Sequence, residues 1–254
     1  MKKALVIGGK GGMGKWLAKF LRSKGYEVFI NDPQGRVKGF KSISGFKDAL
    51  NFKLIALATP ISNTRAILEN IIKEDVNSLI FDLCSVKSPI KNQLLKGARE
   101  GKKIVSIHPM FGPEVENIKS KNILVCDCGN AQAVREVKGL FKGSGARILE
   151  LDLEQHDKFM AYVLSLTHAV NIIFYKTLTQ SSLLKRLIKV SSLNFDAQIK
   201  LATKIIAQDP KLCYEIQSNN PYSIKATKDF TNLFHALQKI LATKDLKKFI
   251  KFMR

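Results

Sequence analysis

Four glycines stand close together near the start of the chain, in the segment Gly9-Lys10-Gly11-Gly12-Met13-Gly14. The segment follows an apolar run, Ala4–Gly8, and opens a stretch whose apolar residues recur at helical spacing. Asp32 stands eighteen residues after Gly14, at the end of a second strand-like run. A GxGxxG sequence alone is a weak indication. A strand, a glycine turn, a helix and a trailing acid in this order are typical of a dinucleotide-binding site.

The residues of this turn have separate tasks in such a site. Gly9 permits the tight turn, Gly11 lets the backbone approach a pyrophosphate, and Gly14 lets the helix pack closely on the sheet. Gly12 and Met13 open the helix, whose amino terminus presents free amide groups and a partial positive charge to the phosphates. We therefore expect all five residues to bind the cofactor.

The acid after the second strand bears on which nicotinamide dinucleotide is used. The Asp32 carboxylate can accept hydrogen bonds from both hydroxyls of a ribose, whereas a 2′-phosphate there would meet a like charge. The sequence therefore favours NAD over NADP. Arg36 lies close enough in sequence to weaken this preference.

Short β-branched runs alternate with helical stretches through the first 150 residues. This alternation is typical of a doubly wound α/β domain, in which a parallel sheet carries helices on both faces. The predicted strands are Ala4–Gly8, Tyr26–Asn31, Leu54–Ala58, Leu79–Asp82, Lys103–Ile107, Asn122–Cys126 and Ala146–Glu150. The predicted helices are Met13–Ser23, Ser62–Ile72, Pro89–Glu100 and Ala131–Phe141. We expect residues 1–150 to form a Rossmann-type dinucleotide-binding domain.

The β pattern stops after about residue 150, and residues 151–254 are predicted to form an all-α domain. Apolar residues recur every three or four positions in Asp157–Thr179, Ser182–Val190, Ala197–Ile206 and Thr227–Leu241. The first of these stretches is apolar on nearly all sides, which exceeds what packing against one neighbour requires. We therefore expect the surplus apolar face of the helical domain to form the interface of a homodimer.

Five short segments occur in an order and spacing that are similar to one enzyme family. They are Gly8–Gly14, Ala58-Thr59-Pro60-Ile61, Asp82-Leu83-Cys84-Ser85-Val86-Lys87, His108-Pro109-Met110-Phe111-Gly112-Pro113 and Ala207-Gln208-Asp209-Pro210. A further match in the helical half comprises Gln155-His156-Asp157, Met160 and His168. On these segments the chain resembles the prephenate dehydrogenases, from its first strand to about Pro221.

The resemblance implies NAD-dependent oxidative decarboxylation of prephenate to 4-hydroxyphenylpyruvate, a step of tyrosine biosynthesis. Prephenate carries a hydroxyl at C4 and a carboxylate at C1 of a cyclohexadiene ring. Removal of hydride from C4 while the carboxylate leaves as CO2 gives an aromatic product, so aromatisation drives the reaction. The protein must hold the ring against the nicotinamide, polarise the C4 hydroxyl and bind two carboxylates.

The resemblance also implies roles for single residues. A neutral imidazole at His108, just beyond the strand Lys103–Ile107, would accept the hydroxyl proton as hydride departs. Ser85 matches a serine that hydrogen-bonds the substrate hydroxyl and the histidine, and His168 matches a residue that helps to bind the substrate side chain. Thr59 and Pro60 fall in the segment expected to bind the cofactor.

The chain departs from the family at the substrate carboxylate. Relatives commonly have arginine five positions before the aspartate of the Gln-Asp-Pro motif, where this chain has Lys204. Lysine keeps the charge but loses the bidentate fork. A second arginine of some relatives corresponds to Asp196. We expect Lys204 to bind substrate, and these differences leave room for arogenate, which carries an amino group on its side chain.

Composition argues against several other classes. The net charge of +21 would suit a nucleic-acid binder, but the excess is spread along the chain, and lysines outnumber arginines 34 to 8. No apolar run approaches the length of a membrane span, and no signal peptide opens the chain, so we expect a cytoplasmic protein. The four cysteines lack metal-ligand spacing, which indicates reduced structural thiols and no metal. His156 and His235 are interpreted as structural or surface residues.

Three alternatives remain open at this point. A β-hydroxyacid-type dehydrogenase would also join a dinucleotide-binding domain to a helical dimer domain, but it would rely on a catalytic lysine in the helical half. A dinucleotide-binding regulator would sense redox state without catalysis, and a nucleic-acid binder would be retained on DNA at moderate salt. No chorismate mutase segment or small regulatory domain is evident, so a separate chorismate mutase is a possible partner.

Overall fold

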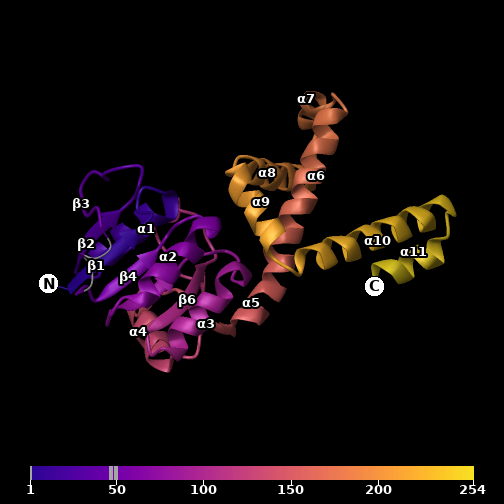
Figure 1. Ribbon diagram of the computed structural model, residues 1–254. Coiled ribbons are helices and arrows are strands. Elements are labelled where there is room, and N and C mark those ends of the chain that lie inside the picture. Colours follow the sequence, from indigo (N-terminus) through magenta and orange to yellow (C-terminus); the bar gives the residue numbers. More distant parts are fainter. Residues whose placement is uncertain (1, 46–47, 49–50) are drawn as a thin grey trace. The chain divides into compact units, whose positions relative to one another are not determined.

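The computed structural model describes residues 2–45, 48 and 51–254, and it divides into two compact units, residues 1–157 and 158–254 (Figure 1). Each unit has its own secondary structure: a sheet with helices in the first, and helices in the second. Among the described residues, no helix combines the length and apolar character that crossing a membrane would require.

The first unit is built on a sheet of eight strands in the order β3-β2-β1-β4-β5-β6-β7-β8. The strands are β1 Lys2–Ile7, β2 Tyr26–Asn31, β3 Lys41–Ser42, β4 Leu54–Leu57, β5 Leu79–Asp82, β6 Ile104–Pro109, β7 Asn122–Asp127 and β8 Arg147–Asp152. Neighbouring strands are parallel except β6 and β7. The chain reverses its order along the sheet after β3 and continues from β1 to β4, as in doubly wound folds.

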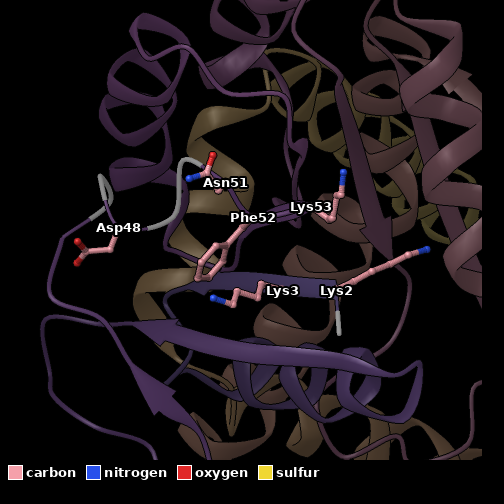
Figure 2. A pocket seen from close by; sticks show the side chains of 6 residues that line it. All are labelled: Lys2, Lys3, Asp48, Asn51, Phe52 and Lys53. Atoms are coloured by element: carbon pink, nitrogen blue, oxygen red, sulfur yellow. The ribbon is translucent and has the colours of Figure 1, made fainter.

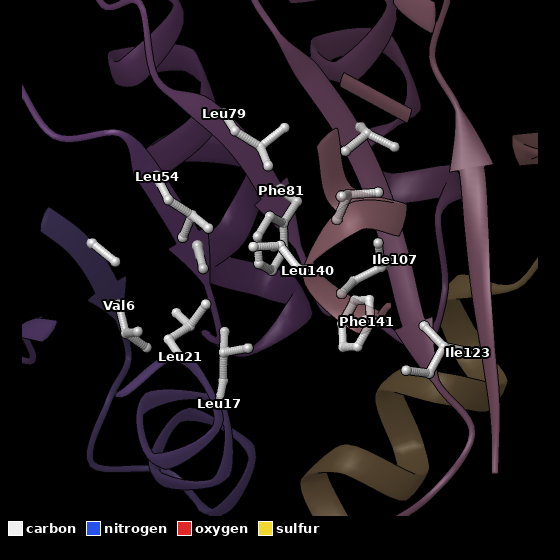
Figure 3. Packing of buried hydrophobic residues seen from close by; sticks show 14 of the residues in the cluster. Val6, Leu17, Leu21, Leu54, Leu79, Phe81, Ile107, Ile123, Leu140 and Phe141 are labelled. Carbon is white, nitrogen blue, oxygen red and sulfur yellow. The ribbon is translucent and has the colours of Figure 1, made fainter. Parts of the chain in front are cut away.

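Helices cover both faces of this sheet. They are α1 Gly12–Ser23, α2 Ile61–Lys73, α3 Lys91–Arg99 and α4 Ala131–Phe141, with a short 3-10 helix, Ser88–Ile90, before α3. Side chains alternate along each strand, so in β1 Val6 belongs to the core under α1 and α4, and Leu5 to the core under α2 and α3. Figure 3 shows the first core, where Leu17 and Leu21 of α1 face the sheet. The predicted doubly wound domain is confirmed.

The strand that carries the predicted catalytic histidine is longer than the sequence suggests. The prediction ended at Ile107, but β6 continues to Pro109, so His108 lies inside the strand. Its parallel neighbour β5 ends opposite Ser106, while antiparallel β7 continues to pair and places Leu124 opposite His108. Pairing with antiparallel β7 therefore continues β6 beyond the point at which its parallel neighbour β5 ends.

The second unit consists of helices. The boundary between the two units, after Asp157, falls within one long helix, which begins in the first unit and continues in the second. This helix comprises α5 Leu153–Met160, a π-helical segment Ala161–Leu166 and α6 Thr167–Gln180. The remaining elements are α7 Leu184–Leu187, a 3-10 helix Ile188–Val190, α8 Leu193–Ile206, α9 Pro210–Asn219, α10 Ser223–Ala242 and α11 Leu246–Met253. α8 packs on α6, α9 and α10 contact the π-helical segment, and α11 lies against α10 (Figure 1).

Two helices of this unit were not predicted, and each begins at a side-chain cap. Pro210 suggests a linker, yet it is the first residue of α9, where the missing amide of proline is not needed. Asp209 caps α9 by accepting a hydrogen bond from the Lys211 amide at 2.9 Å. Asp245 caps α11 by accepting one from the Lys248 amide at 3.0 Å.

Candidate active site

The glycine turn is packed so tightly that three of its four glycines, Gly9, Gly12 and Gly14, cannot be replaced without movement. A Cβ atom at Gly14 would lie 2.2 Å from the Gly8 carbonyl oxygen, and one at Gly9 would lie 2.5 Å from the Ile30 side chain. At Gly11 the nearest atom would be 3.4 Å away, and φ is an ordinary −63°. Neither packing nor backbone conformation therefore demands glycine at Gly11. Open space over the backbone is what a pyrophosphate needs, so this turn fits a dinucleotide.

The Asp32 carboxylate is held next to this turn by two backbone amides. The Lys10 amide donates to Oδ2 at 2.8 Å and the Gln34 amide donates to Oδ1 at 2.9 Å. The carboxylate therefore joins the glycine turn to the loop after β2, and both oxygens keep capacity for further donors. A ribose hydroxyl is one such donor.

The loop after β4 lies directly against the glycine turn. A Cβ atom at Gly8 would come within 2.6 Å of the Ala58 carbonyl oxygen. Thr59, half-buried, shares a 2.8 Å hydrogen bond with Thr64, and the exposed Pro60 precedes the first turn of α2. The structure thus brings Thr59 and Pro60 to the same carboxyl edge of the sheet as the glycine turn.

The hexapeptide His108–Pro113, whose first two residues end β6, packs on the start of α1. A Cβ atom at Gly12 would lie 2.8 Å from Pro113, and the rings of Phe111 and Trp16 meet edge to face with centroids 5.0 Å apart. This packing connects His108, at the beginning of the hexapeptide, to the helix that follows the glycine turn. The two most specific motifs of the sequence therefore meet in one region of the first unit.

His108 is buried and belongs to a chain of hydrogen bonds with two other residues. Its Nδ1 lies 3.0 Å from Nε2 of His156, and Nδ1 of His156 lies 2.8 Å from Oδ1 of Asp157. A carboxylate can only accept, so His156 donates from Nδ1 and accepts at Nε2. His108 must then donate from Nδ1, which leaves its Nε2 without a proton.

Burial keeps both imidazoles neutral. It lowers the pKa of His108 well below the ordinary histidine value, and the neighbouring His156 and the Lys87 ammonium lower it further. Burial also lowers the pKa of His156, although the Asp157 carboxylate opposes the shift. At neutral pH, His108 therefore offers an unprotonated Nε2 that can accept a proton.

Asp157 is fixed by four donors. Besides His156, its Oδ1 accepts from the Lys87 amide at 2.9 Å, and its Oδ2 accepts from the amide and hydroxyl of Ser88 at 2.7 and 2.5 Å. Burial alone would raise the pKa of Asp157, but the hydrogen bonds from His156, Ser88 and the Lys87 amide hold it below its ordinary value. The carboxylate is therefore charged and cannot rotate freely, which fixes the tautomer of His156.

The ammonium group of Lys87 is completely buried beneath this site and makes three hydrogen bonds. It donates to Oδ1 of Asp82 at 3.1 Å, to the Cys84 carbonyl at 2.6 Å and to the Ile107 carbonyl at 2.9 Å. Burial alone would lower the pKa of Lys87, but the Asp82 carboxylate raises it above the ordinary value. Lys87 therefore ties the end of β5 to the residue before His108.

Ser85 lies in the loop after β5, between Cys84 and the Lys87 anchor, and it is half-buried. The hydrogen bonds of the described residues include none between Ser85 and His108. The structure places Ser85 beyond the end of β5, the strand next to that of His108, and its role in catalysis remains a prediction.

The other two predicted site residues belong to the second unit. His168 lies in the first turn of α6, is buried, and in the described part of the chain its Nδ1 has no hydrogen-bond partner. Burial lowers the pKa of His168, so its ring is neutral. Lys204 lies exposed in the last turn of α8, and Asp196 lies exposed in the first turn of the same helix.

His156 was interpreted as a structural or surface residue and not as part of the site. Its ring is completely buried and contacts His108, which excludes the surface alternative. Asp157 and Lys87 were likewise not considered as site residues. The only sequence indication was that all three stand inside motif segments, Gln155-His156-Asp157 and Asp82–Lys87.

The cysteines are buried and unpaired. Burial raises the pKa of Cys84, Cys126 and Cys128, so these three side chains are protonated thiols and poor nucleophiles. Within the described residues, no group of three or more His, Cys, Asp or Glu side chains is placed to hold a metal ion.

A separate hollow lies at the opposite edge of the sheet (Figure 2). Its lining consists of Lys2, Lys3, Asp48, Asn51, Phe52 and Lys53. Lys2 and Lys3 begin β1 and Lys53 precedes β4, whereas ligands of doubly wound sheets bind outside the carboxyl ends of the strands. This hollow is therefore not part of the candidate active site.

Two family models match the chain from residue 17 to its last residue. "Prephenate dehydrogenase, nucleotide-binding domain" matches residues 17–150, and "Prephenate dehydrogenase, dimerization domain" matches residues 152–254. The chain belongs to the prephenate dehydrogenase family. The resemblance seen in the sequence motifs is thereby confirmed, and so is the order of a nucleotide-binding domain followed by a helical one.

Known relatives of this family agree with the assignment. The chain is 26% identical over 267 residues to the "Probable arogenate/prephenate dehydrogenase" of Methanocaldococcus jannaschii, in an alignment that covers 98% of this chain and 59% of that protein. Prephenate dehydrogenase from Aquifex aeolicus, solved with hydroxyphenyl propionate and NAD+, has a TM-score of 0.77 at 22% identity and covers 100% of this chain and 95% of that one. Synechocystis arogenate dehydrogenase has a TM-score of 0.74 at 17% identity, covering 99% and 96%.

The curated relatives are longer than this chain. The chain spans between 55% and 65% of the length of three of them. At the identities found, the solved structures show that the fold is shared. The family consists of dehydrogenases, and the substrate and the dinucleotide of this chain are matters for proposal.

Proposed function

We propose that the protein catalyses the NAD-dependent oxidative decarboxylation of prephenate to 4-hydroxyphenylpyruvate in tyrosine biosynthesis. The observation that carries the proposal is the hydrogen-bond chain from Asp157 through His156 to His108, which leaves Nε2 of His108 as an unprotonated acceptor. Its connection to the glycine turn through the hexapeptide supports a reaction at a dinucleotide.

The chemistry of these residues follows from their geometry and charge. Bound NAD would supply the hydride acceptor. Nε2 of His108 accepts the proton of the C4 hydroxyl as hydride leaves C4. The electron pair of the bond to the C1 carboxylate stays with the ring when CO2 is released, and the resulting phenolate takes the proton back from His108 to give the phenol. The positive charge that His108 acquires is stabilised through His156 by the Asp157 carboxylate, which remains charged throughout. Ser85, on the neighbouring strand end, would orient the hydroxyl.

The second unit would supply the groups that bind the substrate's carboxylates. The buried, unpartnered Nδ1 of His168 is the kind of group that a ligand satisfies, because an unpaired buried polar atom costs about 1–3 kcal/mol. Lys204 would provide the cation for the ring carboxylate.

The second unit would also form a homodimer. The match to a dimerization domain and the exposed apolar side chains of Tyr162, Val163 and Ile173 support this assembly. A monomer in sedimentation at micromolar concentration would contradict it.

Arogenate is the second candidate substrate. It carries an amino group where prephenate has a keto group, and Asp196 stands where some relatives have an arginine. A carboxylate on the same helix as Lys204 would favour a side chain with a cation over one without. The reaction at the ring would be unchanged.

The direct test is NADH formation with prephenate and with arogenate as separate substrates. We expect kcat/KM to be higher for prephenate, with 4-hydroxyphenylpyruvate and CO2 formed in equal amounts. Higher kcat/KM with arogenate would replace the substrate and keep the reaction. Absence of dinucleotide reduction with both acids, despite measured NAD binding, would refute the proposal and favour a sensor.

Replacing Lys204 tests the carboxylate site. Lys204→Ala should raise KM for prephenate about tenfold or more, because a charge-assisted hydrogen bond contributes about 1.5–3 kcal/mol, and should change kcat much less, since the contact already exists in the ground state. Lys200→Ala, one turn earlier on α8 and also exposed, is the matched control. Unchanged saturation by prephenate in Lys204→Ala would assign the carboxylate to another cation.

A further inference from the structure

Thr64 is a buried polar residue in the first turn of α2, and the mechanism proposed above does not use it. Its side chain has no exposed surface. Among the described residues, four polar atoms surround its Oγ1: Oγ1 of Thr59 at 2.8 Å, the Pro60 carbonyl at 3.0 Å, the Thr59 carbonyl at 3.4 Å and Sγ of Cys84 at 3.4 Å. A hydroxyl has one proton to donate and two lone pairs with which to accept, so these contacts restrict one another.

The proton of Thr64 is directed toward the Pro60 carbonyl. A carbonyl oxygen can only accept, so two oxygens 3.0 Å apart need a proton between them, and Thr64 supplies it. Threonine in a helix commonly donates to the carbonyl four residues earlier in this way. The two lone pairs of the Thr64 hydroxyl therefore remain as acceptors.

These two lone pairs accept from Cys84 and from Thr59. Burial raises the pKa of Cys84, so its thiol keeps its proton and donates it to Thr64. The contact with Thr59 joins two hydroxyls, and because the proton of Thr64 is already used, Thr59 is the donor. The Thr59 hydroxyl therefore directs its proton at Thr64 and has only acceptor lone pairs for any other partner.

The side chain of Thr59 is held at its other branch as well. A Cβ atom at Gly8 would lie 3.0 Å from Cγ2 of Thr59, so the methyl group of this threonine lies against the start of the glycine turn. With contacts at both its methyl and its hydroxyl group, the side chain is restricted to one rotamer. Thr59 is half-buried, so the lone pairs of its hydroxyl can meet a ligand at the carboxyl edge of the sheet.

We propose that Thr64 is a positioning residue for the dinucleotide: it takes up the proton of Thr59, so that Thr59 accepts a hydrogen bond from a hydroxyl of the nicotinamide ribose. The inference rests on the proposed function, because it takes the pyrophosphate to lie at the glycine turn and the nicotinamide near His108. Strand β4, which ends before Thr59, lies between β1 and β6 in the sheet, on the path between these two positions. An unrestrained threonine could offer either a proton or a lone pair, and Thr64 fixes this choice.

Titration calorimetry with the full chain tests the inference without any substrate, with NAD and 5′-AMP as ligands. Thr64→Val keeps the volume of the side chain but removes the acceptor of the Thr59 proton. We expect this variant to bind NAD about three- to tenfold more weakly, the contribution of one neutral hydrogen bond. Its affinity for 5′-AMP, which lacks the nicotinamide ribose, should be unchanged, and this binding also shows that the variant is folded.

Thr64→Ser separates the hydroxyl from the packing of the side chain. It keeps all the hydrogen bonds, so its NAD affinity should stay within about twofold of the wild type. A packing role predicts the reverse order, because Thr64→Ser removes a buried methyl group and Thr64→Val does not. That reverse order would overturn the inference. Thr231→Val is the matched control, since exposed Thr231 in α10 makes the same hydrogen bond to the carbonyl four residues earlier, and its loss should leave NAD binding unchanged.

A double-mutant cycle with Thr59→Val determines whether Thr64 acts through Thr59. In the Thr59→Val background, Thr64→Val should cause no further loss of NAD affinity. Additive losses, or equal weakening of NAD and 5′-AMP by Thr64→Val, would overturn the inference, while NAD binding by the wild type upheld the proposed function. Failure of the wild type to bind NAD would refute the proposed function itself.

Discussion

Replacement of His108 by asparagine is expected to lower kcat for prephenate by about 10²–10⁴-fold, the usual contribution of general acid–base catalysis. Asparagine remains polar, but it has no unprotonated ring nitrogen to accept the hydroxyl proton. NAD affinity should barely change, because the phosphates are expected at the glycine turn. Steady-state kinetics for kcat and calorimetry for NAD binding separate these two effects.

The pH profile provides an independent check on His108. As the proposed base, His108 must be neutral, so activity is expected to be lost as pH falls through the pKa of His108, which burial places well below the ordinary value of about 6.5. The wild type should therefore remain fully active through pH 6.5 and lose activity in more acidic buffer. Near-normal turnover of His108→Asn with the acid limb intact would show that another group is the base.

Unfolding must be followed over the same pH range. Histidines that are buried as neutral groups bind fewer protons when folded than when unfolded, so their contribution to stability is present above about pH 6.5 and declines as pH falls below it. Thermal unfolding at each pH distinguishes this loss of folded protein from protonation of the base in folded protein.

Elements with complete local patterns were predicted well from the sequence. The bounds predicted for Tyr26–Asn31, Leu79–Asp82 and Ala131–Phe141 coincide with β2, β5 and α4. The last begins where the Asn130 side chain accepts a hydrogen bond from the Ala133 amide at 3.0 Å, a cap that is visible in the sequence. The dinucleotide fingerprint belongs to the same class, because all its parts lie within one strand–turn–helix unit.

Features that depend on distant partners were not predicted. The two-residue β3 is too short for periodicity, and the antiparallel direction of β7 is set by its pairing with β6. The π-helical segment Ala161–Leu166 interrupts a stretch that has ordinary helical spacing in the sequence. An unbroken α-helix would place His156 and His168 about 120° apart around its axis. Because the π-helical segment lies between them, this angle does not apply.

The candidate site also contains both features that local motifs predict and features that depend on residues far apart in the sequence. Glycine positions and the strand-end histidine follow from local motifs, whereas the hydrogen bond between His108 and His156 joins residues 48 positions apart. Lys87 similarly reaches a carbonyl 20 positions away. A charged lysine with no exposed surface contradicts the usual expectation for its residue type, and only the packing of β5 against β6 supplies its acceptors.

We propose that His156 positions His108, and two substitutions of different length can separate this role from simple packing. The amide of glutamine reaches as far as Nε2 of a histidine, so His156→Gln can still present an acceptor to His108. The amide of asparagine reaches only as far as Nδ1, so His156→Asn can keep a hydrogen bond to Asp157 but loses the contact with His108. In the asparagine variant the His108 ring is free to carry its proton on Nε2, where it cannot act as the base.

We expect His156→Asn to lower kcat about 10²-fold with little change in KM. This effect is intermediate between that of losing an outer hydrogen-bond partner and that of a wrong tautomer in a catalytic triad. His156→Gln should stay within about tenfold of the wild type. Both variants remove part of a buried ring and should lose similar thermal stability, so a packing role would reduce their activities together. Equal activities of the two variants would show that His156 only fills space and that His108 selects its tautomer by other means.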